Sequence, residues 1–215
     1  MLCWKPQIEL DAPCWESFRK FLEVLPGDAF PNTDSLNELL PTGTITRHGA
    51  AIRFVPAAGL PGVDYERHIY LSGQVATREH SWHDLFNALV WCRLPRLKAA
   101  MNELHFLNLD RAKNGSRGPL RDALTLLDES GVIVYGPDGD ALDALAGRDW
   151  DSAFLKYRAR WGATLRVVIC GHAILEKFLR PYRSITAHAL LLRTPGPFSV
   201  EALDHCLGAS LGKKG

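Results

Sequence analysis

The segment 77–110 holds residue types that could bind a metal ion and activate water. His80, His83 and Asp84 stand at the start of an expected helix, and His105 stands near the end of the next one. Imidazole nitrogens and carboxylate oxygens are suitable ligands for divalent zinc or manganese. His83, His105 and His80 are therefore candidate metal ligands, and a metal ion held with one open position would activate water for hydrolysis. For each histidine alone, a hydrogen-bonded structural role is the commoner one.

Asp84 is a candidate catalytic residue beside that metal. The adjacent His83 and Asp84 resemble the pair of HD-type phosphohydrolases, although a dipeptide is a weak signal. Ser81 and Asp84 also have the spacing of a helix capping box, with aspartate in place of the usual glutamate. The sequence leaves both roles open.

The geometry of this site depends on Pro95. Proline disfavours the α conformation in the residue before it and fits the first turn of a new helix, so helices are expected over 82–92 and 95–109. If they form an antiparallel hairpin, His83 faces the level of His105. If the proline only kinks one long helix, the two histidines are about 33 Å apart. The metal site requires the hairpin.

A second candidate site lies in ICGHAILEK, residues 169–177. An expected strand over 165–171 would deliver His172 to the start of an expected helix over 172–180, at a strand end where ligands bind in α/β units. His172 is therefore a candidate catalytic residue. Cys170 beside it is either a nucleophile or a small buried hydrophobe, and packing is favoured because no third, orienting residue is evident.

Paired carboxylates stand in ALTLLDESGVIVY, residues 123–135, which is expected to form a β-hairpin around Asp128 and Glu129. Such a pair suits a metal or acid/base chemistry, and Glu129 is a candidate catalytic residue. The ordinary preference of acidic residues for turns is the alternative explanation.

The loop RAKNGSRGP, residues 111–119, is the best anion-binding element of the chain. Its glycines let the backbone approach a phosphate, and arginine forks onto phosphate oxygens. Arg117, Arg121 and Lys113 are therefore candidate substrate-binding residues. The loop lacks the spacing of a nucleotide-binding P-loop, and a solvated loop without a ligand is the alternative.

Composition places the chain among ordinary globular proteins. It has 215 residues, 47% hydrophobic, and a formal net charge of +1, which excludes long disorder, collagen and coiled coil. No segment has the length of a membrane span and the N-terminus does not read as a signal peptide, so a cytoplasmic protein is expected. The five cysteines form no C-x-x-C pair, so no disulfide framework or cysteine zinc site follows.

The net charge conceals blocks of opposite sign. Residues 93–121 carry seven basic and two acidic side chains, 122–151 carry one and eight, and 152–215 carry ten and three. The blocks either pair with one another in the fold or mark a surface for a partner. Pairing is the expected arrangement because the blocks are self-complementary.

The pattern of elements predicts an α+β fold: one globular domain over 1–215, with helices packed on a small mixed or antiparallel sheet and a possible helical subregion at 1–43. Strands are expected in AIRFVP and YERHIYLSG. The remaining expected elements are a helix over 13–25, a helix over 149–161, a strand over 185–192 and a helix over 199–210.

Four motifs in order along the chain resemble a known family. They are WHDLFNALVW, the Pro-x-x-Lys of 95–98, TLLDESG and GHAILEK. Together, over about two thirds of the chain, they are similar to the bacterial family called domain of unknown function 3025. The resemblance implies a single bacterial domain and carries no mechanism.

The leading functional expectation is a metal-assisted hydrolase of a phosphorylated substrate, which unites the histidines with the basic loop. The alternative is a non-catalytic protein that binds an anionic partner, a nucleic acid or a phosphorylated ligand, through the basic segment 93–121. Whether the chain is an enzyme, and its oligomeric state, are not decided by the sequence.

Overall fold

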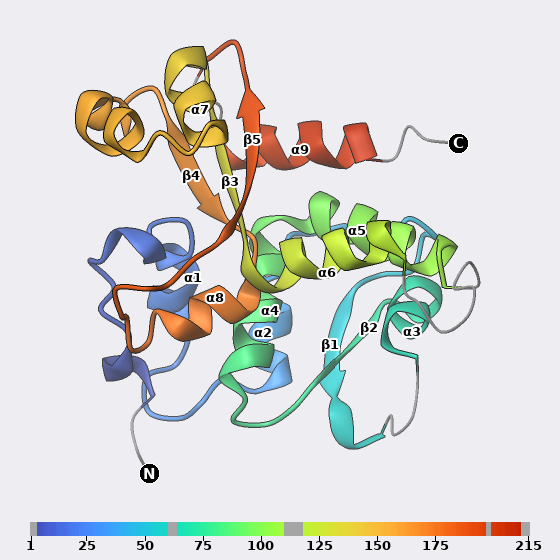
Figure 1. Cartoon of the computed structure of the whole chain (residues 1–215). Coiled ribbons are helices and arrows are strands. Elements are labelled where there is room, and N and C mark those ends of the chain that lie inside the picture. The colour runs from blue at the N-terminus through green and yellow to red at the C-terminus, as the bar shows by residue number, and fades with distance from the viewer. Residues whose placement is uncertain (1–3, 60–63, 110–117, 197–198, 212–215) are drawn as a thin grey trace.

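The computed structural model describes residues 4–59, 64–109, 118–196 and 199–211. Helices surround two small sheets, which confirms the α+β class (Figure 1). The α-helices among the described residues are α1 (Arg19–Val24), α2 (Thr33–Leu39), α3 (Tyr65–Ser72), α4 (Trp82–Arg93), α5 (Pro95–Leu107), α6 (Pro119–Ser130), α7 (Gly139–Ala146), α8 (His172–Lys177) and α9 (Val200–Leu211). None of the helices in the described segments is long and apolar enough to cross a membrane.

The strands form two separate sheets. Their bounds are β1 (Arg53–Pro56), β2 (Gln74–Thr77), β3 (Gly131–Gly136), β4 (Arg166–Ile169) and β5 (His188–Arg193). β1 and β2 pair in parallel, joined by α3, in register Phe54 to Val75. β3 is the middle strand of the other sheet, antiparallel to β4 and parallel to β5. The expected small sheet is therefore mixed.

Helix α4 lies at the centre of the molecule, between the two sheets (Figure 1). Its residues from Leu85 to Cys92 are all buried, and Asn87 is the one polar side chain among them. Trp15, in a 3₁₀ turn (Pro13–Trp15), stacks on Phe86 with ring centroids 5.5 Å apart. The N-terminal helical region therefore packs on the same apolar core as α4.

The junction of α6 with β3 brings two distant segments into backbone contact. The backbone N–H groups of Cys170 and Gly171 both donate to the carbonyl of Gly131, at 3.1 and 2.9 Å. A Cβ atom at position 171 would lie 2.3 Å from the backbone nitrogen of Gly131, which is too close for any side chain. Glycine at position 171 therefore lets the start of α8 rest against the end of α6.

Two strand expectations are wrong. The expected hairpin over 123–135 is instead α6 followed by β3, because Pro119 begins a helix in which Leu124 turns inward. YERHIYLS forms α3 because the carboxylate of Asp64 accepts a hydrogen bond from the N–H of Arg67 at its start. In both segments helix initiation outweighs β-type composition.

Two expected helices are interrupted. Over 13–25, only the 3₁₀ turn and α1 are helical. Over 149–161 there is a π-helical turn (Ser152–Lys156) and a 3₁₀ turn (Arg158–Arg160). The N–H of Tyr157 bonds to the carbonyl of Ser152, while the carbonyl of Ala153 accepts from the indole of Trp161 at 2.8 Å. The Trp161 indole therefore occupies the Ala153 carbonyl, which in a continuous α-helix would accept from the N–H of Tyr157.

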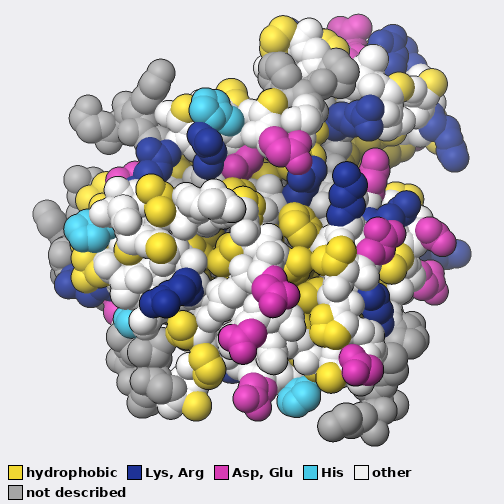
Figure 2. Space-filling view, turned by 180° about the vertical axis from the view of Figure 1, so that it is seen from behind, with side chains coloured by type: hydrophobic (Ala, Val, Ile, Leu, Met, Phe, Trp, Pro, Cys, Tyr) yellow, Lys and Arg dark blue, Asp and Glu magenta, His cyan; other side chains and the backbone are white. Residues whose placement is uncertain are grey.

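Ion pairs confirm that the charge blocks pair with each other. In the acidic block 122–151, Asp128 pairs with Lys98 at 2.5 Å, Asp138 with Arg160 at 2.6 Å and Asp143 with Arg193 at 3.4 Å. Figure 2 shows acidic and basic side chains interspersed on the face opposite to that of Figure 1. Three acidic residues of this block are therefore paired with basic residues from other segments.

Candidate metal centre

Three side chains from three helices converge at one point. His83 comes from the first turn of α4, Glu129 from the last turn of α6 and His172 from the first turn of α8. One ligand atom of each lies within 4.8 Å of those of the other two, which within the described ranges is the one group of this kind. We call it the His83–Glu129–His172 group.

The distances suit a shared ion. Nε2 of His83 and Nε2 of His172 are 2.9 Å apart, and Nε2 of His172 is 3.7 Å from Oε2 of Glu129. Two ligands about 2.1 Å from one metal are about 3.0 Å apart at a right angle and about 3.4 Å apart at the tetrahedral angle. Small shifts would thus place all three atoms around one divalent cation.

Carboxylates stand behind both imidazole rings. Oε2 of Glu176 lies 3.6 Å from Nδ1 of His83, and Oδ2 of Asp128 lies 3.8 Å from Nδ1 of His172. The buried Nδ1 of His172 has no hydrogen-bond partner among the described residues. Histidines that bind metals donate their other ring N–H to a carboxylate or carbonyl, and these two carboxylates lie just beyond hydrogen-bond distance.

The protonation states favour ligation at His172. Burial lowers the pKa of His172 to about 4, against the opposing effect of the Asp128 carboxylate, so the ring is neutral at pH 7. Burial raises the pKa of Glu129, and the nearby His83 opposes this. Metal binding requires neutral imidazoles and an ionised carboxylate, and a cation would itself favour the ionised form of Glu129.

A buried chain of polar groups supports the centre. Nζ of Lys98 donates to Asp128 and, at 2.9 Å, to Oδ1 of Asn87. Asn87 in turn donates to the hydroxyl of Tyr65 at 2.9 Å. Although burial alone would raise the pKa of Asp128, the Lys98 ammonium and His172 lower it. Asp128 is therefore an anion held behind His172.

The group opens onto a cavity of about 630 Å³, here called the histidine cavity. Its walls include the side chains of Tyr65, Glu66, Arg121 and Thr125 as well as the group itself. Burial raises the pKa of Glu66 to about 7, while its hydrogen bond from Asn102 opposes the rise. A carboxyl group that titrates near neutrality is suited to proton transfer.

The chain bends at Leu94, but the antiparallel hairpin that the metal hypothesis required does not form (Figure 1). Lys98 on α5 reaches back to Asn87 on α4, which in one straight helix would be about 16 Å away along the axis. Figure 1 shows α5 steeply inclined to α4, so the two helices do not lie antiparallel. The bend nevertheless places His83 and His105 in the wall of the same cavity.

The expected ligand set His83, His105 and His80 is not brought together. His105 is buried in the cavity wall but is outside the His83–Glu129–His172 group. His80 has a φ of 56° and its ring packs 5.6 Å from that of Phe30. His83 remains a candidate ligand, and Glu129 and His172, first considered as catalytic residues, join it as candidate ligands.

Asp84 holds the segment before α4. Its two carboxylate oxygens accept from the backbone N–H and the guanidinium of Arg78, at 2.7 to 2.9 Å. Its own N–H bonds to Oγ of Ser81, as in an N-cap. Asp84 lines the cavity, but its oxygens are already engaged by Arg78.

The candidate phosphate ligands are only partly described. Arg121 lines the histidine cavity, whereas Lys113 and Arg117 lie outside the described residues. The thiol of Cys170 is buried and its pKa is raised to about 12 by that burial, which suits packing rather than nucleophilic attack.

The sequence reasoning missed Tyr65, Glu66 and the partnership of His83 with Glu129 and His172. Tyr65 and Glu66 were assigned to a strand, and Glu129 to a hairpin turn. The Asp64 cap of α3 and the Pro119 start of α6 are the sequence signals that place them on helices.

Comparison with known proteins gives the chain a family. No curated protein and no solved structure matches it. The family model described as "Protein of unknown function (DUF3025)" matches residues 52–208, a span that contains all residues named above as lining the histidine cavity. The matched span is well over half of the chain, which therefore belongs to the DUF3025 family.

Proposed function

We propose that this protein is a metal-dependent hydrolase that acts on a phosphorylated substrate in the histidine cavity. The observation that carries the proposal is the convergence of His83, Glu129 and His172 within 4.8 Å on the wall of a 630 Å³ cavity. Cavities of this size accept small metabolites.

Two histidines and one carboxylate leave coordination positions open. Zinc and manganese are the cations proposed, and the same ligand set also suits ferrous iron. A bound divalent cation lowers the pKa of a water molecule and generates hydroxide near neutral pH. The role of this chain is to hold the cation by two neutral imidazoles and an anionic Glu129, with Asp128 and Glu176 orienting the rings.

The walls favour a phosphate group. Arg121 lies in the wall, and its buried Nε has no hydrogen-bond partner among the residues described. The Tyr65 hydroxyl accepts from Asn87, which leaves its own proton for a substrate oxygen. An arginine fork and a hydroxyl donor together suit the oxygens of a phosphate ester.

In the proposed reaction, hydroxide attacks phosphorus and the bond from phosphorus to the leaving oxygen breaks. The leaving alkoxide takes up one proton, and the products are an alcohol and inorganic phosphate. Glu66, whose pKa is about 7, is the wall residue suited to supply that proton. Water restores the proton after product release.

The test combines metal analysis with an assay. Purified full-length protein is dialysed against zinc, manganese or ferrous iron, its metal content is measured, and hydrolysis of p-nitrophenyl phosphate is followed. We expect about one ion per chain and metal-dependent hydrolysis that His172→Ala and Glu129→Ala abolish. Absence of bound metal under all three conditions would refute the proposal.

The alternative is recognition of an anionic partner, such as a nucleic acid, through the basic segment 93–121. Two of the four basic side chains in its described part are held in ion pairs within the fold, Arg93 with Glu201 and Lys98 with Asp128. A non-catalytic binding role therefore has less support than the hydrolase. Nucleic-acid affinity that falls steeply with salt would favour it.

A further inference from the structure

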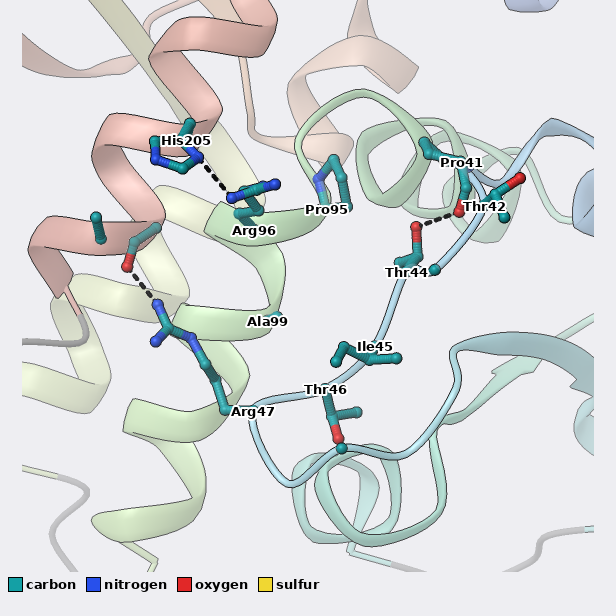
Figure 3. A pocket seen from close by; sticks show the side chains of 14 residues that line it. Pro41, Thr42, Thr44, Ile45, Thr46, Arg47, Pro95, Arg96, Ala99 and His205 are labelled. Atoms are coloured by element: carbon teal, nitrogen blue, oxygen red, sulfur yellow. Dashed lines mark hydrogen bonds between the residues drawn. The ribbon is translucent and has the colours of Figure 1, made fainter.

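A second cavity lies at the start of α5, apart from the histidine cavity (Figure 3). Its volume is about 570 Å³, and it is enclosed by the loop 41–49, the first turn of α5 and the last turns of α9. It shares no lining residue with the histidine cavity. We call it the arginine cavity.

The charge of the arginine cavity is of one sign. Its lining includes two guanidinium groups, Arg47 and Arg96, and the imidazole of His205, and none of its lining residues is acidic. Figure 3 shows both arginine side chains reaching toward α9 across the cavity. The carboxylate of Asp204 lies near Arg96 but is not part of the lining, and the positive charge of the lining attracts an anion.

The protein does not neutralise this charge through an ion pair among its described residues. Arg96 bonds to Nδ1 of His205, Arg47 donates to the carbonyl of Gly208, and neither partner is a carboxylate. Asp204, next to His205, instead accepts from the backbone N–H groups of Arg96 and Leu97 at 3.1 and 2.9 Å. Because a guanidinium has five N–H donors, each arginine keeps donors for a ligand.

Hydrogen bonds and close helix packing fix the walls of the arginine cavity without a ligand. In the loop, the Thr44 hydroxyl donates to the carbonyl of Pro41 at 2.7 Å, and the buried Thr46 hydroxyl donates to the carbonyl of Tyr70. On the other side, a Cβ atom at Gly208 would lie 2.7 Å from Cβ of Arg96. Glycine at position 208 therefore lets α9 approach α5 closely with Arg96 at the rim.

The remaining walls are apolar. Pro41, Ile45, Pro95 and Ala99 line the cavity, and Ile45 exposes half of its surface. A fully hydrated inorganic ion would leave this surface in contact with water. An anion that carries an apolar body would cover it.

We infer that the arginine cavity binds a small organic phosphate. The phosphate oxygens accept from Arg47, Arg96 and His205, and the organic part covers Ile45 and Pro95. Two forked guanidiniums match the two negative charges and several acceptor oxygens of a phosphate monoester better than the single charge of a carboxylate. The site is independent of the metal centre and of the proposed hydrolysis.

The test uses the full-length protein in the presence of EDTA, so that no metal-bound phosphate contributes. Phenyl phosphate is titrated while the Nε–Hε nuclear magnetic resonance signals of Arg47, Arg96 and Arg121 are followed. We expect saturable shifts of the Arg47 and Arg96 signals. Inorganic phosphate, which lacks the ring, and benzoate, which lacks the second charge, should each bind at least about tenfold more weakly.

Variants locate the site. Arg47→Gln and Arg96→Gln should each weaken phenyl phosphate binding about tenfold, whereas Arg183→Gln on an exposed loop should not. Arg96→Lys keeps the charge and should weaken binding less than Arg96→Gln. The inference is overturned if the wild-type Arg47 and Arg96 signals do not move, if benzoate binds equally well, or if both glutamine variants retain wild-type affinity.

Discussion

Nε2 of His172 lies 2.9 Å from Nε2 of His83, although 89 positions separate the two residues in the chain. The rings meet edge to face, with centroids 4.3 Å apart. Two imidazole nitrogens at this distance must share a proton or a cation, since two lone pairs would repel each other. With Glu129 beside them, a divalent cation would satisfy all three side chains at once.

Removing one imidazole should therefore empty the metal centre. We expect His172→Ala to lower bound zinc or manganese from about one ion per chain to less than a tenth, because two remaining ligands bind a divalent cation weakly. Plasma mass spectrometry after gel filtration measures this. His48→Ala, at an exposed histidine, is the matched control and should keep its metal. Equal metal content in the two variants would contradict ligation by His172.

Acid should destabilise the metal-free protein through His172. Its pKa is about 4 in the folded state and about 6.5 when unfolded, so the unfolded chain binds a proton that the folded chain excludes. The free energy of unfolding holds this contribution in full above pH 6.5. It loses on the order of 3 kcal/mol as the pH falls toward 4. Glu66, with its pKa raised to about 7, acts in the opposite sense.

Glu66 is present in both wild type and His172→Asn, so the difference between their pH dependences of stability reports the contribution of His172 alone. Urea unfolding of both proteins, with EDTA present, at pH 7 and pH 4.5 gives four free energies of unfolding. We expect the wild type to lose more stability between these pH values than the variant does. Equal losses would show that His172 is not kept neutral by burial.

Lys98 should be among the most costly polar side chains to remove. It is buried, and its ammonium bridges Asp128 and Asn87. Lys98→Met leaves the buried Asp128 carboxylate without its cation, which should cost about 3 to 5 kcal/mol. The double variant Lys98→Met, Asp128→Asn also lacks the buried carboxylate charge, so much of the lost free energy of unfolding should be recovered. Urea unfolding checks both, and a double variant no more stable than the single one would refute the pairing argument.

Gly171, the N-cap residue of α8, should not tolerate a larger side chain. A methyl group at Gly171 meets backbone atoms of Gly131 and Ser130 at 2.3 and 2.6 Å, so Gly171→Ala should cost about 2 kcal/mol or more and displace His172 from Glu129. Gly196→Ala, where a Cβ meets nothing within 4 Å, is the control and should be close to neutral. Thermal unfolding and metal content are the two measurements. A Gly171→Ala protein with wild-type values for both would refute the close approach.

Arg121 should affect substrate binding and leave the metal in place. Arg121→Gln removes the positive charge that would face a phosphate of the proposed substrate, and we expect kcat/KM for p-nitrophenyl phosphate to fall about tenfold to a hundredfold. Metal content should stay at the wild-type level. Arg183→Gln serves as the charge-matched control, and equal kinetics for the two variants would count against phosphate recognition by Arg121.

Local patterns in the sequence were enough for many of the elements and for the fold class. The helices over 82–93 and 95–107, divided at Pro95, follow from rules that act within one or two turns. So do β4 and the start of α8 around Gly171. Each of these segments carries a boundary residue whose conformational preference is strong.

The expectations failed where β-type composition competed with a helix start. Tyr65 to Ser72 and Pro119 to Ser130 contain residues that suit either structure, and packing against α5 and α8 accompanies the helical outcome. Glu129 consequently stands on a helix end and not in a turn. That difference decides where its carboxylate points.

The sequence by itself determined that His83, Glu129 and His172 are residues capable of metal chemistry, because that depends only on side-chain type. Only the tertiary structure decided that these three meet, while His80 packs against Phe30 and His105 stays outside the group. The reason is physical: the meeting depends on the packing of α4 and α6 against α8 and on the backbone contact between Gly131 and Gly171, both of which join segments far apart in the chain.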